Sequence, residues 1–432
     1  MQKKIAAVLF STRLTAILFL VFAAAMAVGT FLDVGYQNAP SAYTTALIYN
    51  AWWFEAIMVM FVLNFTGNIF RYKLLRKEKW ATLTMHLAFI FILLGAFVTR
   101  YIGFEGMMAI REGATEQTFL SQKTYVTTYI DGDYMVNNQV QRLVRNDEVD
   151  FSGRLTNKFS YSTDYNGQPI HVELVDFIAG AEEDIIPDEA GEEYLKIVEA
   201  GAGAPHNHFL KVNQVQSIHN VLYTLNKPTE GAVNIQVTDS TLTIQSPYEG
   251  EYMTMATNAQ GLLVKDSIQP LYLRSRYVFG SFQMVIPKPV IKGKIDIVEK
   301  SKFVNTFDED GLLFKIETNG ETKTVGVLGG KGLNGGFKKI EIGGLDIYMQ
   351  FGAKVLELPF SIKLNDFEAE RYPGTERGYS SYSSQVTVLD KESGDFDYKI
   401  FMNNILQHKG YRFFQSSFDP DEKGTVLSVN HD

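Results

Sequence analysis

Two patterns of apolar residues divide the chain. Up to residue 100, apolar side chains form continuous runs over 14–32, 51–70 and 81–99. A helical run of about 20 residues, rising about 1.5 Å per residue, crosses the roughly 30 Å hydrocarbon core of a bilayer. We therefore predict a transmembrane domain over residues 1–100 that contains three helices. A cleaved signal peptide is the alternative for the first run, but two more runs close behind it favour a retained helix.

From residue 101 onwards, short segments alternate between apolar and polar residues, as Ile170–Phe177 and Ile295–Val298 do. Gly, Asn and Asp interrupt these segments about every 8–12 residues, a spacing typical of sandwiches and barrels. We predict a large antiparallel β domain over 101–432, and hence a membrane protein of α plus all-β class. Helical periodicity is weak in this region and is best over Glu192–Ala200.

An internal similarity raises the question of two β units. Val172–Ala179 aligns with Ile362–Ala369 at an offset of 190 residues. The region is also longer than a typical single core. One interpretation is a duplication with units at 101–260 and 261–432, and the other is chance similarity between strands of like composition.

The composition excludes several classes of protein. With 46% hydrophobic and 21% charged residues, the chain is neither disordered nor fibrous. A formal net charge of −9 argues against a nucleic-acid-binding protein. The sequence contains no cysteine, so it has no disulfide, thiolate metal site, Cys nucleophile or covalent c-type haem site.

The charge differs in sign between the two regions. Residues 1–100 contain nine Lys and Arg against three Asp and Glu, a net charge of +6, and the remaining 31 and 46 give −15. The basic residues lie in the N-terminal tail and the second loop, whereas the first loop, 33–50, has no Lys or Arg. The positive-inside rule then places the N-terminus in the cytoplasm and the β domain outside it. Glu55, one turn inside the second span, is expected near water at the outer interface.

Two further segments invite a binding role. Glu182–Glu193 contains seven Asp and Glu, and we interpret it as a solvated acidic loop, with calcium ligation as the alternative. Gly326–Gly332 lacks the spacing of a phosphate-binding loop, so we predict a hairpin turn.

His86 is the candidate for chemistry inside the membrane. An ionisable side chain in a bilayer needs a partner and is by default a functional hypothesis, and neutral imidazole is a standard axial ligand of haem iron. A helix–helix hydrogen bond is the alternative role. Because one histidine fills one axial position, a six-coordinate haem needs a second ligand from another helix.

The other histidines give weaker signals. His206 and His208 suit a metal only weakly, and we predict an exposed turn there. His171 alternates with apolar residues and is expected to face solvent or a neighbouring strand. The remaining histidines have no visible metal companion in the sequence: His219, His408 and His431.

Five motifs resemble the ResB/CcsB family of System II cytochrome c biogenesis, and in particular the N-terminal half of the fused CcsBA cytochrome c synthetases of Bacteroidetes. The motifs are Thr84–Leu87, Gly103–Gly113, Leu358–Phe367, Tyr372–Ser384 and Gly410–Gly424. The resemblance implies a bacterial inner-membrane protein that takes part in haem export and in haem attachment to apocytochrome c. It also implies that His86 is an axial ligand of haem b, with the second ligand supplied by the CcsA half.

The CcsA half carries the family's other haem-handling histidines and its tryptophan-rich segment. We therefore expect no haem-attachment activity from this chain alone. Family members usually have a fourth span after the external domain, so we expect either a truncated sequence or a protein that continues beyond Asp432. The external domain is predicted either to present strand edges to apocytochrome, at Tyr379–Ser384 and Phe413–Phe418, or to dock the CcsA half. A membrane-anchored β protein that binds peptides or envelope partners without a cofactor is the alternative function.

Overall fold

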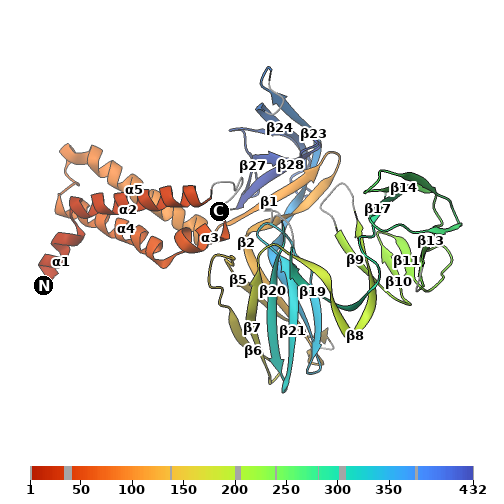
Figure 1. Ribbon diagram of the computed structural model, residues 1–432. Coiled ribbons are helices and arrows are strands. Elements are labelled where there is room, and N and C mark those ends of the chain that lie inside the picture. The colour runs from red at the N-terminus through yellow and green to blue at the C-terminus, as the bar shows by residue number, and fades with distance from the viewer. Residues whose placement is uncertain are drawn as a thin grey trace. The chain divides into compact units, whose positions relative to one another are not determined.

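The computed structural model describes residues 2–33, 41–136, 139–199, 206–238, 241–280, 282–300, 308–374 and 378–431. The predicted fold class is confirmed, because three long apolar helices precede a large, mainly antiparallel β region (Figure 1). Contacts divide the chain into two compact units. The first comprises Met1–Gly180 and Val304–Asp432, and the second is the intervening Ala181–Phe303.

The long helices of the first unit match the predicted spans within two residues. They are α2 (Thr12–Leu32), α4 (Trp52–Arg71) and α5 (Trp80–Tyr101), and each is long and apolar enough to cross a membrane. α4 contacts both α2 and α5 through a cluster that includes Leu18 and Phe61. Short elements accompany them: α1 (Gln2–Leu9), α3 (Ala42–Thr44), η1 (Thr45–Tyr49) and η2 (Lys77–Lys79).

A ten-stranded sheet runs through the β part of the first unit. Its order is β25-β24-β23-β2-β1-β28-β27-β26, with β22 on β23 and β5 on β2. The strands are β1 (Phe104–Arg111), β2 (Thr115–Asp131), β5 (Leu143–Glu148), β22 (Lys338–Ile342), β23 (Leu345–Arg371), β24 (Tyr379–Leu389), β25 (Phe396–Phe401), β26 (Leu406–His408), β27 (Tyr411–Phe418) and β28 (Gly424–His431). A separate hairpin joins β3 (Met135–Val136) to β4 (Gln139–Val140).

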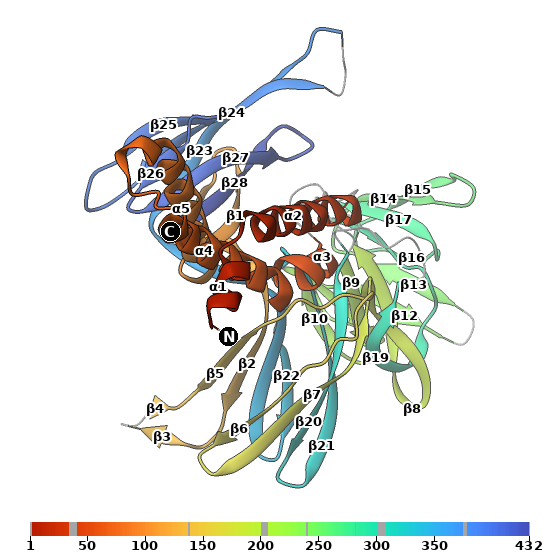
Figure 2. The ribbon, with the colours of Figure 1, turned by 90° about the vertical axis from the view of Figure 1, so that its left-hand side faces the viewer.

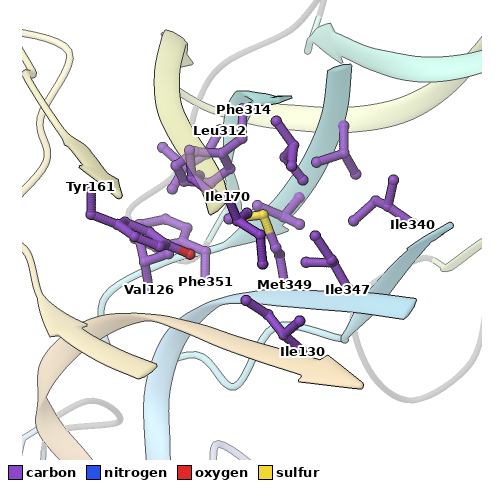
Figure 3. Packing of buried hydrophobic residues seen from close by; sticks show 14 of the residues in the cluster. Val126, Ile130, Tyr161, Ile170, Leu312, Phe314, Ile340, Ile347, Met349 and Phe351 are labelled. Atoms are coloured by element: carbon purple, nitrogen blue, oxygen red, sulfur yellow. The ribbon is translucent and has the colours of Figure 1, made fainter. Parts of the chain in front are cut away.

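One half of this sheet forms a sandwich with a four-stranded sheet. The second sheet has the order β21-β20-β7-β6 (Figure 2). Alternate residues of the facing strands are buried between the two layers, among them Phe314 and Ile347 (Figure 3). Its strands are β6 (Ser160–Tyr165), β7 (Gln168–Ile178), β20 (Asp310–Thr318) and β21 (Glu321–Gly329).

The other half of the large sheet curls around a second core. A tight turn with a bridge between Phe401 and Asn404 connects β25 to β26, and β25 contacts both β26 and β27, so the two edges of the sheet approach each other. The hydroxyl of Tyr398 donates to the Ile405 carbonyl at 3.0 Å across the same junction. The core inside the curl includes the fully buried Ile362 and Phe413.

The second unit is a sandwich of its own. A five-stranded sheet, β10-β11-β12-β13-β16, and a seven-stranded sheet, β15-β14-β17-β18-β8-β19 with β9 on β8, share one core. The strands are β8 (Ala181–Glu199), β9 (His206–Lys211), β10 (Val215–Ile218), β11 (Val221–Leu225), β12 (Val233–Val237), β13 (Leu242–Gln245), β14 (Gly250–Thr254), β15 (Gln260–Leu263), β16 (Ile268–Pro270), β17 (Ser275–Phe279), β18 (Phe282–Val285) and β19 (Ile291–Glu299).

This arrangement corrects the predicted division at residues 260 and 261. That boundary lies inside β15, whereas Ala181 pairs with Glu299 and brings the two ends of the second unit together. The unit is therefore an insertion rather than one of two tandem repeats. The two aligned segments also lie in different sheets, since Val172 belongs to the four-stranded sheet and Ile362 to the ten-stranded sheet.

Three predictions for short segments of the β region were wrong, and a fourth is confirmed in part. Glu192–Glu199 and the acidic run from Glu182 both belong to strand β8, because β19 pairs with residues 181–187 and 193–194 and β9 pairs with residues 194–199. Within this strand Lys196 lies 3.2 Å from Asp184, which offsets part of the acidic charge. His206 and His208 lie on strand β9, and residues 200–205 lie outside the described residues. The turn predicted in Gly326–Gly332 is confirmed only after Gly329, where strand β21 ends and Gly330 forms a bridge with Leu333.

Candidate functional site

His86 lies near the Trp80 end of α5. It is six residues into the helix, about 9 Å along the axis at 1.5 Å per residue. The apolar sequence on both sides continues the helix through this position, so the imidazole is held within a helix that is long and apolar enough to span a membrane. Its side chain is half-buried.

The hydrogen bond of His86 defines which ring nitrogen is free to bind. Nδ1 lies 2.9 Å from the carbonyl oxygen of Thr82, one turn earlier on the same helix. A carbonyl oxygen only accepts, so Nδ1 carries the proton and Nε2 keeps its lone pair. Binding of the second nitrogen to a fixed acceptor is the usual way in which proteins orient a ligating histidine. The arrangement therefore suits a metal-ligating imidazole.

Aromatic side chains from α4 and α5 form an apolar wall beside His86. The ring of Phe65 meets the imidazole edge to face, with centroids 5.5 Å apart. Phe65 also stacks on Phe89 at 5.2 Å and on Phe61 at 5.8 Å. Flat apolar side chains of this kind exclude water and fit a planar hydrophobic ligand.

The described surface of α5 is open. None of its residues is buried, whereas α4 buries seven, including Phe61 and Phe65. The faces of α5 that do not contact α4 are therefore available to lipid or to further membrane helices.

A polar network on α4 was missed by the sequence reasoning. The amide of Asn64 donates to the Leu9 carbonyl at 2.6 Å, and its oxygen accepts from Thr15 at 2.6 Å. Asn68 donates to Asn64 at 2.9 Å, but its own Oδ1 is buried without a hydrogen-bond partner among the described residues. The signal was present in the sequence, because two asparagines four residues apart share one face of a helix.

Glu55 lies at the opposite end of the helices from His86. Its carboxylate accepts from Arg100 at 2.6 Å and from the Tyr101 hydroxyl at 2.9 Å. Arg100 also donates to the Tyr49 carbonyl at 2.5 Å. Glu55 is thus the partly exposed anchor that joins the start of α4 to the end of α5.

Five of the other histidines have side-chain partners in the β region. His171 lies 2.9 Å from the Ser162 hydroxyl, and the His431 ring packs on Tyr411. His408 lies 2.7 Å from the buried carboxylate of Asp390. The prediction that His219 lacks a metal companion was wrong, because Nε2 of His219 lies 3.0 Å from Glu199, which also contacts His208.

Each of the two predicted strand edges includes a stretch that pairs with a neighbouring strand on one side and has no paired strand on the other side. Tyr379–Tyr382 pairs with β23, and the ladder to β25 begins at Ser383. Phe414–Phe418 pairs with β28, and the ladder to β26 ends at Phe413. Among the described strand pairings, none occupies the second side of either segment. The two segments meet through their rings, with Tyr382 and Phe418 at 5.2 Å.

Comparisons with known proteins agree with the resemblance seen in the sequence. Residues 335–431 match the model of the ResB-like family, a segment that contains strands β22 to β28 but not His86. The chain is also similar to Protein NrfI of Wolinella succinogenes, with 25% identity over 418 residues. That alignment covers 96% of this chain and 31% of the relative, so the chain spans about a third of the relative's length.

Proposed function

We propose that this chain acts in cytochrome c biogenesis, as the ResB part of a membrane complex that exports haem. The observation that carries the proposal is the imidazole of His86, which is held in a membrane-spanning helix with Nε2 free to bind. The ResB-like match and the similarity to Protein NrfI supply the family context.

The residues around His86 fit one side of a haem b site. Nε2 would be one axial ligand, and the Thr82 carbonyl would keep the ring oriented and raise its basicity. Phe65 and Phe89 would cover the porphyrin and keep water away. The haem supplies the group that becomes joined to the cysteines of apocytochrome c, whereas this chain has no cysteine and contributes ligation and positioning.

The second axial ligand would come from the CcsA half or subunit. α5 has no buried residue in this chain, and two-thirds of the length of the matched relative lies outside the alignment. The proposal therefore expects no haem-attachment activity from this chain alone.

The test is the reduced-minus-oxidised absorption spectrum of the detergent-purified chain co-expressed with a CcsA partner. We expect bis-histidine b-type bands in the wild type, and loss or a shift of these bands in His86→Ala. Leu87→Ala is the matched control, because Leu87 is the exposed neighbour on the same helix. Identical spectra in wild type and His86→Ala would remove His86 from the site.

The unpaired strand edges favour a second role, in which the β region binds an extended peptide. Segments such as Tyr379–Tyr382 offer free backbone groups for β-augmentation, with aromatic rings beside them. The peptide would be the segment of unfolded apocytochrome c that receives haem, attracted by the net charge of −15 beyond residue 100.

Binding of a labelled apocytochrome peptide, followed by fluorescence anisotropy, tests this role. Tyr382→Ala and Phe418→Ala each remove one of the aromatic rings that lie beside the unpaired edges. Weaker binding in both variants, with unchanged haem bands, supports a peptide platform. Unchanged binding in both would favour a scaffold that docks the CcsA half, and a colourless wild-type complex that still binds peptide would favour the cofactor-free alternative.

A further inference from the structure

Two histidines and a glutamate meet in the second unit, which contains none of the helices. Nε2 of His208 lies 3.1 Å from Glu199 Oε2, and Nε2 of His219 lies 3.0 Å from the same oxygen. The three ligand atoms lie within 4.8 Å of one another. Because every member belongs to Ala181–Phe303, the cluster is independent of His86.

The sheet geometry brings Glu199 and His208 to one face. Leu195, Ile197 and Glu199 alternate along β8, and the first two are fully buried in the core. His208 on β9 is the direct partner of Ile197, so its side chain lies on the same face as Glu199. The pair therefore sits where the apolar core ends.

His219 reaches the pair from the other sheet of the sandwich. It forms the tight turn between β10 and β11 together with Asn220, and both residues have positive φ, 46° and 64°. Its side chain is 61% exposed, compared with 16% for Glu199. The cluster thus opens to solvent on the His219 side, which gives an ion a path of entry.

We propose that Glu199, His208 and His219 form a binding site for a divalent transition-metal ion of the zinc type. Zinc bonds to imidazole nitrogen and carboxylate oxygen are about 2.0–2.1 Å long, so two ligand atoms of a tetrahedral site lie about 3.3 Å apart. The two nitrogen–oxygen separations are close to that value. Two histidines and one carboxylate are an established zinc ligand set, with the fourth position open to water.

Two further observations distinguish this cluster from an ordinary hydrogen-bonded pair. The Tyr223 hydroxyl is fully buried and has no hydrogen-bond partner among the described residues. Burial, and to a smaller extent the Glu199 carboxylate, raises the pKa of Tyr223. Its hydroxyl is a donor whose hydrogen has no acceptor among the described residues.

The second observation is the lack of a competing cation. Across the described part of the chain, the ion pairs of Glu199 are both with histidine. Asp390, which also accepts from a histidine, is in contrast neutralised by Lys409 at 2.9 Å. A divalent ion at Glu199 would supply the missing positive charge and would tie the β10–β11 turn to strands β8 and β9.

The test is zinc binding by the full chain, purified in detergent without a histidine tag and stripped with a chelator. We expect one equivalent of zinc per chain by mass spectrometry after dialysis, and tetrahedral d–d bands when cobalt(II) replaces zinc. His208→Ala and His219→Asn should each lose the bound metal and the cobalt bands. His171→Ala is the matched control and should retain both, because His171 lies outside the cluster.

His219→Asn keeps the test decisive if His208→Ala does not fold. The position is exposed, and asparagine adopts positive φ more readily than other residues with a Cβ. Retention of zinc and cobalt bands in folded His219→Asn, or no stoichiometric zinc in the wild type, would overturn the proposal. Neither result would bear on the haem spectrum of His86.

Discussion

The carboxylate of Asp390 is a buried charge of the β region that accepts several hydrogen bonds. It is 3% exposed and accepts hydrogen bonds from the backbone of Glu392, from Lys409 and from His408. These bonds hold the pKa of Asp390 well below its usual range. A carboxyl whose pKa is lower in the folded protein stabilises it above the unfolded pKa of about 4, and this contribution is lost as the pH falls.

We therefore expect Asp390→Asn to lower the melting temperature of the full chain at pH 7. The difference between the variant and the wild type should shrink below about pH 4, because the wild-type carboxyl then becomes protonated on unfolding. Thermal unfolding followed by circular dichroism from about pH 3 to about pH 8, on both sides of the unfolded pKa, measures both effects. Glu189→Gln, an exposed carboxylate on β8, is the control. A difference that does not depend on pH would contradict the assignment.

Single residues also mark the limit of prediction from sequence. His86 was identifiable because an ionisable side chain stands out in an apolar run. The partnership of Glu199 with His219 was not, because twenty positions separate them and the contact depends on the β8–β9 pairing and on the turn between β10 and β11. Sequence spacing carries no information on such contacts between two sheets.

At the scale of a helix, α4 provides a comparison of two asparagines. Asn64 forms hydrogen bonds through both the oxygen and the nitrogen of its amide, whereas the Asn68 oxygen has no hydrogen-bond partner within the described part of the chain. Replacing a buried group that is hydrogen-bonded leaves its partners without a hydrogen bond and lowers the stability by about 1–3 kcal/mol. Removing an unsatisfied oxygen relieves a cost of similar size. We expect Asn64→Leu to destabilise the helices by about 1–3 kcal/mol, and Asn68→Leu to stay within about 1 kcal/mol of the wild type.

Unfolding of the two variants in mixed detergent and dodecyl sulfate micelles measures this difference. The substitutions are identical in chemistry, so each variant is the control of the other. Equal destabilisation would show that the Asn68 oxygen has a partner in the folded protein.

Whole elements were predicted best where one physical requirement dominates. The three spans were placed within two residues because a bilayer demands about 20 apolar residues. Strand β8 was predicted as a loop and a helix because its many acidic residues are not typical of a strand. In the structure, β9, β18 and β19 pair with it and hold it in the sheet. Pairing of this kind overrides local propensity, and it joins strands about 100 residues apart, such as β8 and β19.

For the whole molecule, the proposed orientation places the α4–α5 connection in the cytoplasm and the β region outside it. The sequence has no cysteine, so an introduced cysteine is a unique reporter. We expect an impermeant maleimide to label Lys391→Cys in intact spheroplasts, and Lys77→Cys only after detergent is added. Both positions are exposed. The unmodified protein controls for background, and labelling of Lys77→Cys in intact spheroplasts would reverse the orientation.

The division into two units leads to a prediction for removal of the second unit. Its core uses residues from Leu195 to Ile286 alone, whereas the two β cores and the helix cluster of the first unit use none of them. Ala181 and Glu299 are paired across antiparallel strands, so a short Gly-Ser linker can replace residues 182–298. We expect the shortened chain to fold in detergent and to keep the haem bands that depend on His86, while losing the zinc site. Loss of the haem bands together with the fold would mean that the first unit needs the inserted sandwich. A folded protein without the bands would instead place the contact with the haem partner on the second unit.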